Sequence, residues 1–329
     1  MTHYPFVSIL MPIRNEEHFI ERSLGAILAQ TYPSDCMEIL IADGMSTDNT
    51  RTLIQQMQGK HHITIIDNPE KIQAFGLNHI IPLAKGDFLI RIDGHTVIAP
   101  HYVEKCVETL QVTQADNVGG PMNPVGITTV GKAIASAGKS PFAVPTAFHV
   151  SATPQWTDTV YLGAWPQSVF KRIGLYNTQV GVNEDYELNV RIRNTGGKIY
   201  FTPEIQSEYY GRQTLSALAK QYYRYGRSRV RTLKKHPQSL KPRHLIAPLF
   251  VIGLLTGAVL SLVHPLFFTL WALGILAYSA LNIAFSIKTM LKSQLSVTSA
   301  VYLPLVFLVI HLTWGSGFLI EWVAPKTEF

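Results

Sequence analysis

The chain has 329 residues, with 28 Lys and Arg against 22 Asp and Glu, and a formal net charge of +6. This length predicts about two structural units rather than one simple core. The two cysteines, Cys36 and Cys106, exclude a disulfide framework or a cysteine-based metal site. The apolar run at Phe6–Ile13 is too short for a signal peptide and is broken by Pro12 and Arg14. We therefore expect the first two-thirds to stay on the side of the membrane where it is synthesised.

The predicted strands and helices alternate through the first half, which predicts an α/β fold with a parallel sheet. In chain order they are strand 7–13, helix 16–30, strand 38–43, a helix capped by Ser46, Thr47 or Asp48 and ending at Met57, strand 62–67, helix 72–83, strand 87–93, and a helix from Pro100 to Thr113. Gly119–Pro154 is rich in Gly, Pro, Ser and Thr and is predicted as loops. Strand 161–165, helix 184–193, strand 198–204 and an amphipathic basic helix 214–235 complete the pattern.

The positive charge gathers in one segment. Between Glu208 and Glu321 the chain has no acidic residue, and Arg212–His244 carries ten Lys and Arg. Basic runs bind nucleic acid or anionic lipid. Because long apolar runs follow this one, we expect membrane lipids as the partner and no nucleic acid.

Three apolar runs, 245–262, 266–287 and 297–320, are each long enough to cross a hydrocarbon layer about 30 Å thick. A single such run could be a core helix, but three in succession predict membrane spans. Basic residues precede the first run, and Lys288 and Lys292 separate the second from the third. The positive-inside rule then predicts a multi-pass protein of the cell (inner) membrane with a cytoplasmic N-terminal domain. The runs hold no Asp, Glu, Lys or Arg that would mark an ion path, which disfavours a transporter.

Acidic residues follow two predicted strands and open one helix. Asp43 and Asp93 end strands, and Glu184-Asp185 begins a helix. Ligands of α/β sheets bind beyond the carboxyl ends of the strands, so these acids predict a cleft for a charged substrate held through a divalent metal. Each acid also has a structural interpretation, as a turn former at Asp43 and as a complement to the helix dipole at Glu184-Asp185.

The side chains near these acids suggest particular chemistry. Asp93 and His95 can share a Mn²⁺ or Mg²⁺ ion, although a lone loop histidine is more commonly a plain surface residue. Asp185 can act as a general base toward an attacking hydroxyl. Arg224 suits a diphosphate, because a guanidinium binds pairs of oxygens, but Gln221–Tyr225 also suits the face of an interfacial helix.

These motifs, in this order, resemble the inverting family 2 glycosyltransferases of GT-A fold, most of all the membrane-bound branch typified by the succinoglycan-biosynthesis glucosyltransferase. The similarity covers about residues 5–235. VSILMPIRNEEHFI resembles the first strand with its Asn-Glu turn, IADGMSTDNT the nucleotide-binding segment, RIDGH the Asp-x-Asp metal motif, NEDYEL the Glu-Asp motif, and QYYRY the Gln-x-x-Arg-Trp motif of processive members. His95 stands in place of the second Asp of the metal motif, and Tyr225 in place of the Trp.

The resemblance implies a Rossmann-like GT-A catalytic domain with a mostly parallel sheet over residues 1–210, an interfacial helix region over 211–244, and three transmembrane helices within 245–329. It implies transfer of a hexose from a nucleotide-diphosphate sugar, with a UDP-sugar expected, to a lipid-linked saccharide in polysaccharide or glycan biosynthesis. The implied residues are Asp185 and Glu184 for catalysis; Pro12, Arg14, Asn15, Glu16, Asp43, Gly44, Gln221 and Arg224 for substrate; and Asp93 and His95 for Mn²⁺ or Mg²⁺.

Three alternatives stay open. The acceptor could be a bare polyprenyl phosphate, or the product could be a processively built polysaccharide. The altered metal motif at His95 also leaves a non-catalytic nucleotide-binding membrane scaffold.

Overall fold

A computed structural model of the chain describes residues 4–59, 62–143 and 151–324. The chain divides into two compact units, the first formed by Met1–Asn123 and Thr146–Tyr210, the second by Pro124–Pro145 and Gly211–Phe329. Residues 124–145 precede the boundary predicted at 210, yet they group with the C-terminal unit. The functional domains predicted over 1–210, 211–244 and 245–329 stay predictions.

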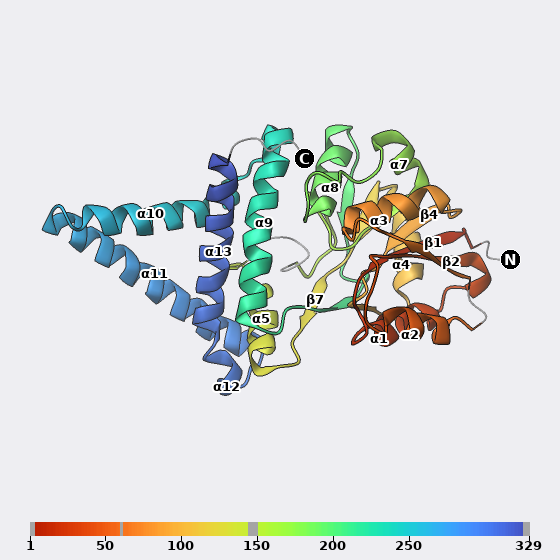
Figure 1. Cartoon of the computed structure of the whole chain (residues 1–329), viewed down its shortest axis with the longest axis horizontal. Helices are drawn as coiled ribbons and strands as arrows, with labels where there is room; N and C mark the ends of the chain where they lie inside the picture. Colours follow the sequence, from red (N-terminus) through yellow and green to blue (C-terminus); the bar gives the residue numbers. More distant parts are fainter. Residues whose placement is uncertain (1–3, 60–61, 144–150, 325–329) are drawn as a thin grey trace. The chain divides into compact units, whose positions relative to one another are not determined.

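The first unit is a mixed α/β structure (Figure 1). Its strands are β1 (Val7–Ile13), β2 (Met37–Asp43), β3 (Ile63–Asp67), β4 (Phe88–Arg91), β5 (Thr96–Ile98), β6 (Asn117–Gly119), β8 (Gln155–Thr157), β9 (Ala164–Pro166), β10 (Ile199–Phe201) and β11 (Ser207–Tyr210), while β7 (Met122–Val125) continues into the second unit. Its helices are α1 (Ile20–Leu28), α2 (Thr50–Met57), α3 (Gln73–Ile80), α4 (Tyr102–Thr113), α7 (Gln167–Ile173) and α8 (Glu184–Asn194).

The large sheet has the strand order β3-β2-β1-β4-β9-β6-β10-β8. The strands β3, β2, β1 and β4 run parallel, as do β6 and β10, whereas β9 runs antiparallel to both β4 and β6, and β8 antiparallel to β10. The register pairs Ile13 with Asp43 and Asp43 with Asp67. The α/β prediction is confirmed, and the parallel pairing holds over the half of the sheet that the sequence predicted best.

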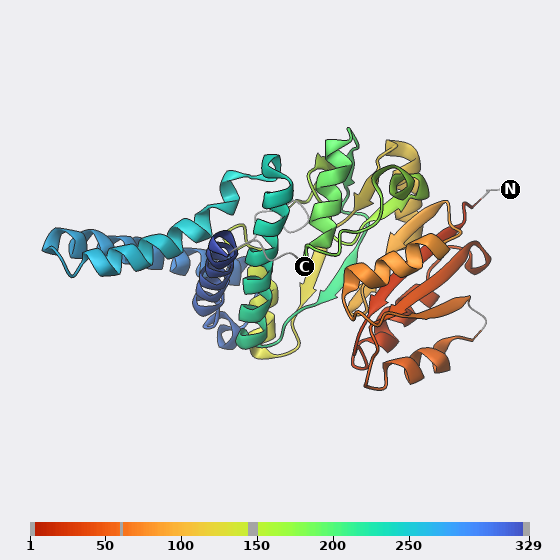
Figure 2. The same cartoon turned by 45° about the horizontal axis from the view of Figure 1, so that its top comes forward.

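Helices cover both faces of this sheet, as Figures 1 and 2 show. Side chains alternate between the faces of a strand. Val7, Ile9, Met11 and Ile13 of β1 therefore pack with α1, α2 and α4, whereas Leu10 packs with α3, α7 and α8. β1 is buried along its whole length, as expected for an interior strand that lies between β2 and β4.

Several sequence predictions were wrong in their boundaries. The loops predicted over 119–154 contain β7 and the helix α5 (Thr129–Gly138), while 144–150 lie outside the described residues. The sequence did not predict α5 because its buried positions are Gly, Ala and Ser, which do not form a recognisable apolar face. The strand predicted at 161–165 is β9, the one at 198–204 shrinks to β10, and the helix predicted from Pro100 begins at Tyr102.

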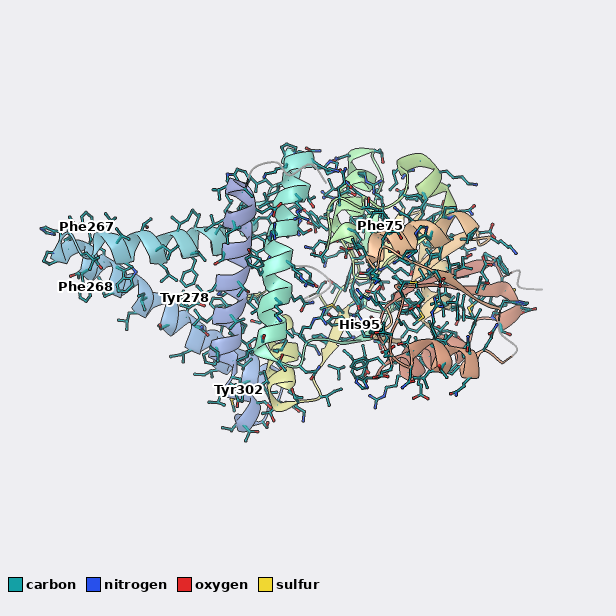
Figure 3. The ribbon with its side chains drawn as sticks, in the orientation of Figure 1. Phe75, His95, Phe267, Phe268, Tyr278 and Tyr302 are labelled. Carbon is teal, nitrogen blue, oxygen red and sulfur yellow. The ribbon has the colours of Figure 1, made fainter. Side chains whose placement is uncertain are left out.

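The second unit is helical. It contains α5, α9 (Leu215–Lys235), α10 (Ile246–Leu260), α11 (Pro265–Lys292), α12 (Val297–Ala300) and α13 (Leu303–Val323). Three segments, Pro242–Leu260, Pro265–Lys292 and Val297–Val323, are long and apolar enough to cross a membrane. Both views draw α9 and α13 side by side, and Figure 3 places Phe267 and Phe268 at the turn between α10 and α11.

Candidate functional site

The predicted acids gather at the carboxyl edge of the parallel strands. Asp43 is the last residue of β2, and Asp93 follows β4 by two residues. Since β1 lies between these strands, the ends of all three meet at one edge. The Gly44 N–H donates to the Ile13 carbonyl at 2.8 Å, and a Cβ added to Gly94 would lie 2.7 Å from Glu16 Cγ. The loops after β1, β2 and β4 are therefore in contact.

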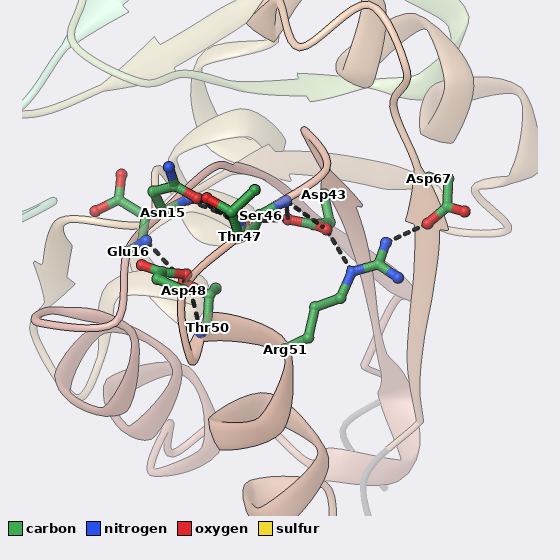
Figure 4. Close-up of polar contacts among 9 residues, drawn as sticks. All are labelled: Asn15, Glu16, Asp43, Ser46, Thr47, Asp48, Thr50, Arg51 and Asp67. Carbon is green, nitrogen blue, oxygen red and sulfur yellow. Dashed lines mark hydrogen bonds and ion pairs between the residues drawn. The ribbon is translucent and has the colours of Figure 1, made fainter.

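The loop after β1 is joined to the loop after β2 by hydrogen bonds (Figure 4). The Asn15 N–H donates to Ser46 Oγ at 2.9 Å, the Thr47 N–H donates to Asn15 Oδ1 at 2.9 Å, and the Glu16 N–H donates to Thr50 Oγ1 at 2.8 Å. Asn15 has φ of 54°, in the left-handed region that asparagine tolerates better than most residues. The side chain of Ser46, one of the residues predicted to cap the next helix, therefore holds the neighbouring loop.

The predicted cap of α2 is confirmed in part, because Asp48 accepts from the Thr50 N–H of the first turn at 3.1 Å. The N-cap residue is Asn49, whose side chain makes no capping hydrogen bond. Asp48, one of the predicted caps, accepts from Thr50 Oγ1 at 2.6 Å as well, and from the Glu17 N–H of the neighbouring loop at 3.2 Å.

Asp43 is fully buried and organises its own loop. Its carboxylate accepts from the Ser46 N–H at 3.2 Å, from the Ser46 hydroxyl, and from Arg51 Nε. Arg51 also donates to Asp67 at the end of β3 (Figure 4). A buried carboxylate with these donors needs no further partner for stability, so a contact between Asp43 and a nucleotide stays a prediction.

Arg91 joins Asp93 to Glu184. Arg91 Nε donates to Asp93 Oδ1 at 2.8 Å, and Arg91 Nη1 lies 2.9 Å from Glu184 Oε1. The side chains of Arg91, Asp93 and Glu184 are only 6%, 12% and 5% exposed. Gln73, at the start of α3, adds a hydrogen bond to Asp93 Oδ1 at 2.9 Å. This chain of contacts unites two of the three predicted acidic positions.

The two acids that flank Arg91 differ in their affinity for protons. Burial alone acts to raise the pKa of Asp93, but the charge and hydrogen bonds of Arg91 outweigh it and hold the pKa below its usual value. Burial raises the pKa of Glu184 to about 7, opposed by the charge of Arg91 and reinforced by that of Asp185. Asp93 is therefore an anion at neutral pH, whereas Glu184 exchanges a proton there.

Asp185 occupies the next position of α8 and is half-buried. Asn183, with φ of 63°, ends the preceding loop, so Glu184 and Asp185 both fall in the first turn of the helix. Successive helical residues point about 100° apart. Glu184 can thus be buried against Arg91 while Asp185 remains partly accessible beside it. The positive end of the helix dipole favours negative charge at both positions.

The described residues alone do not form a complete metal site. Within residues 4–59, 62–143 and 151–324, no group of three or more His, Cys, Asp or Glu is placed to hold an ion. Asp93 Oδ1 accepts from both Arg91 and Gln73, whereas Oδ2 accepts from Arg91 at 3.3 Å and keeps capacity for a cation. His95 Nδ1 lies 2.8 Å from Glu16 Oε1. Since Mg²⁺ sites commonly combine one or two carboxylates with substrate phosphates, Asp93 fits such an ion.

The remaining predicted substrate residues are divided between the two units. Pro12 is buried within β1, and Arg14 is exposed in the loop after it. Gln221 and Arg224 lie in α9 of the second unit, where Gln221 Nε2 donates to the Tyr225 hydroxyl at 2.8 Å and Arg224 is exposed. Their contact with a substrate bound at Asp93 stays a prediction.

The sequence analysis missed Arg91, Gln73 and Arg51. Arg91 had a recognisable signal, because it is a charged residue within the apolar strand FLIRI, and buried arginines are almost always paired. Gln73 and Arg51 carry no such signal, since each is a polar residue in the first turn of a short helix.

The sheet order and the acid-lined edge define a GT-A type α/β protein. The same fold is found in a mannosyltransferase, PcManGT from Pyrobaculum calidifontis, in complex with GDP-Man and Mn²⁺, with a TM-score of 0.60, 19% identity, and coverage of 98% of this chain and 88% of that one. The family model described as "Glycosyl transferase family 2" matches residues 8–159.

This chain belongs to glycosyltransferase family 2. It is 30% identical over 314 residues to the succinoglycan biosynthesis protein ExoA of Rhizobium meliloti (strain 1021), covering 94% of this chain and 93% of that protein. It is also 29% identical over 239 residues, 70% of this chain and 74% of the relative, to a Methanococcus voltae dolichyl N-acetyl-alpha-D-glucosaminyl phosphate 3-beta-D-2,3-diacetamido-2,3-dideoxy-beta-D-glucuronosyltransferase.

Proposed function

We propose that this chain transfers a hexose from a nucleotide-diphosphate sugar to a lipid-linked saccharide, with inversion at the anomeric carbon, in polysaccharide or glycan biosynthesis. The observation that carries the proposal is the buried link from Asp93 through Arg91 to Glu184, which brings the predicted diphosphate site beside the predicted base Asp185. The Methanococcus relative, whose name describes a sugar transferred to a dolichyl-linked sugar phosphate, supports the acceptor class.

The joined loops after β1 and β2 are the proposed site of the nucleotide. Asn15 and Glu16 offer polar groups there, and the buried Asp43 carboxylate holds the loop after β2 through Ser46. Pro12 is in register with Ala42 of β2, the Gly44 N–H bonds the Ile13 carbonyl, and exposed Arg14 is available to a phosphate. We propose a UDP-sugar as donor, and the GDP-Man bound to PcManGT makes a guanine nucleotide the first competitor to test.

Asp93, together with His95, would hold Mn²⁺ or Mg²⁺ against the diphosphate. When bound, such an ion neutralises charge that grows on the departing nucleotide diphosphate. The Mn²⁺ in PcManGT supports this assignment. The low pKa of Asp93 keeps its carboxylate ionised and ready for a cation at neutral pH.

Asp185 is the proposed general base. The acceptor hydroxyl gives its proton to Asp185 while its oxygen forms a bond to the anomeric carbon. The bond from that carbon to the diphosphate oxygen breaks on the opposite face, and its electron pair leaves with the nucleotide diphosphate. Glu184 touches no reacting atom in this scheme, and it positions Asp185 through its buried contact with Arg91.

The base assignment is tested by Asp185→Asn. We expect sugar transfer to fall by at least about 100-fold, as for loss of a general base, while nucleotide affinity stays within about twofold. Glu108→Gln is the matched control, because Glu108 is an exposed acid in α4 that pairs with Lys105. Transfer by Asp185→Asn at the rate of the control would exclude Asp185 as the base.

The substrates are tested by incubating native membranes with radiolabelled nucleotide sugars and extracting the lipids. We expect label on a lipid-linked oligosaccharide. Label on a monosaccharide phosphate lipid would instead identify a polyprenyl phosphate acceptor, and a long polymer would identify a processive synthase. Bound nucleotide without transfer from any donor would favour the scaffold interpretation. Undiminished transfer in excess chelator would exclude the metal assignment.

The membrane setting is part of the proposal. The apolar segments of the second unit would anchor the enzyme in the cell (inner) membrane, with the catalytic unit in the cytoplasm. The basic residues that flank these segments support this orientation by the positive-inside rule.

A further inference from the structure

We propose that α13 does not cross the membrane but lies along its surface beside α9. Only the hairpin of α10 and α11 enters the bilayer, and the C-terminal end of α13 stays on the face from which the hairpin enters. This inference concerns the second unit alone and does not depend on the proposed reaction.

The first observation is the close contact between α9 and α13. A Cβ added to Gly226 of α9 would lie 2.1 Å from the Trp314 carbonyl oxygen, and a Cβ added to Gly317 of α13 would lie 2.2 Å from the Tyr223 carbonyl oxygen. Real Cβ atoms do not approach that closely, so only glycine permits this packing. The two backbones are therefore in direct contact at the middle of both helices.

The contact extends to both ends. Near their N-termini, Leu218 of α9 shares an apolar cluster with Leu303 and Phe307 of α13. Near their C-termini, Glu321 of α13 pairs with Arg227 at 2.6 Å and with Arg231 at 2.9 Å. The helices consequently run parallel over their whole lengths, and any depth that α13 reaches in a bilayer is also reached by α9.

The composition of α9 excludes a position across the hydrocarbon. Its 21 residues contain no Asp or Glu and seven cations, spread from the second turn to the last: Lys220, Arg224, Arg227, Arg229, Arg231, Lys234 and Lys235. Lys220, Arg224 and Lys234 are exposed. Charged side chains at the centre of a bilayer are strongly disfavoured, whereas the same cations at the headgroup level attract anionic lipid. A helix of this kind lies at the surface, and α13 lies with it.

The second observation concerns the two ends of the hairpin, which both contact α13. At the start of α10, a Cβ added to Gly315 of α13 would lie 2.5 Å from the Ala247 carbonyl oxygen. Toward the end of α11, Asn282 Nδ2 donates to the Pro304 carbonyl of α13 at 3.0 Å. A hairpin that enters a membrane and returns has both ends on one face. A helix that bridges these ends runs along that face.

The apolar surface of the unit agrees with this arrangement. In the most apolar window of the α13 segment 39% of residues are buried by protein, against 17% for the α10 segment and 6% for the α11 segment. The turn of the hairpin, marked by Phe267 and Phe268 in Figure 3, lies far from α13. Leu262 at this turn is 87% exposed. The hairpin is thus the part of the unit whose exposed surface fits the interior of a lipid bilayer.

The test is the membrane sidedness of three positions in the full-length chain. With half-buried Cys36 replaced by serine, single cysteines are introduced by Val112→Cys in α4, Val263→Cys at the hairpin turn, and Val323→Cys at the end of α13. These side chains are 78%, 73% and 78% exposed. Sealed vesicles of each orientation are treated with a membrane-impermeant maleimide, before and after detergent.

We expect the Val323→Cys and Val112→Cys variants to be labelled from the same face, and the Val263→Cys variant never from that face before detergent. Labelling of Val323→Cys and Val112→Cys from opposite faces would show that α13 crosses the membrane and would overturn the proposal. Labelling of Val263→Cys from the face of Val112→Cys would equally overturn it, because the hairpin would not be inserted.

A reporter fusion removes the dependence on cysteine variants. In the unmodified chain, a fluorescent protein that matures only in the cytoplasm is fused after residue 329 or before residue 1. We expect both fusions to give the same result, either both fluorescent or both dark. A difference between the two ends would contradict the proposal.

Discussion

Replacing Arg91 by methionine is the sharpest test of the buried link. The change keeps much of the apolar volume but removes the cation that lies 2.8 Å from Asp93 and 2.9 Å from Glu184. The two carboxyl groups remain buried, at 12% and 5% exposure. Removing one partner of a buried ion pair destabilises a protein by about 3–5 kcal/mol. Gln73 still donates to Asp93, so we expect about 4 kcal/mol, or roughly 8–16 °C in the melting temperature of a unit of this size.

The measurement is thermal unfolding of the detergent-purified chain at pH 5 and pH 8, followed by tryptophan fluorescence. Arg91→Met should lower the melting temperature, relative to the wild type, by more at pH 8 than at pH 5. At pH 8 Glu184 is ionised without a cation beside it. Adding Glu184→Gln should recover about half of the loss, since it removes one of the two stranded charges. The reasoning would be refuted by a melting temperature within 3 °C of the wild type. It would also be refuted if the loss of melting temperature changed neither with pH nor on adding Glu184→Gln.

Three further outcomes follow from the contacts above. The raised pKa of Glu184 gives stability that is complete below about pH 4.5 and is lost as the pH rises through about 7, so Glu184→Gln should flatten the fall in melting temperature between pH 5 and pH 8; an unchanged slope would assign it to other groups. Gly317→Leu should lower the melting temperature of the second unit by several degrees, whereas Gly274→Leu, with open space around it, should not; equal effects would contradict the close packing of α9 and α13. Asp43→Asn should speed amide hydrogen exchange in the loop after β2 by about tenfold, as expected when a net hydrogen bond of about 1.4 kcal/mol is lost, and unchanged exchange would show that Asp43 does not hold this loop.

The parts of the fold that follow local rules could be predicted from the sequence. The strands that end at Ile13, Asp43 and Arg91 are mostly apolar runs with polar residues at or just after their ends, a pattern that indicates buried parallel strands. Asp43 at the end of β2 and Asp93 just beyond β4 were located for the same reason. The helix α5 was missed because Ala and Gly carry too little apolar surface to mark a buried face.

The features that depend on distant contacts were out of reach. The pairing of Arg91 with Glu184 joins residues far apart in the chain, and the sequence around either residue does not predict the other as its partner. Ser46 and Asp48, both predicted as caps of α2, also accept from N–H groups of the loop after β1, and the local sequence does not indicate these contacts. Hydropathy likewise describes α13 as apolar on all sides, and only its packing on α9 reveals that one side faces protein.

The hydrogen bonds between the loops after β1 and β2 have a thermodynamic consequence for ligand binding. Because Asn15, Ser46, Thr47 and Thr50 already restrain each other, most of the conformational entropy of these loops is lost when the protein folds. A ligand that binds there contacts loops that are already ordered, so little binding free energy is lost in ordering them. The nucleotide that we propose for this site should then bind with a small heat-capacity change, set by the surface it covers rather than by rearrangement of the backbone.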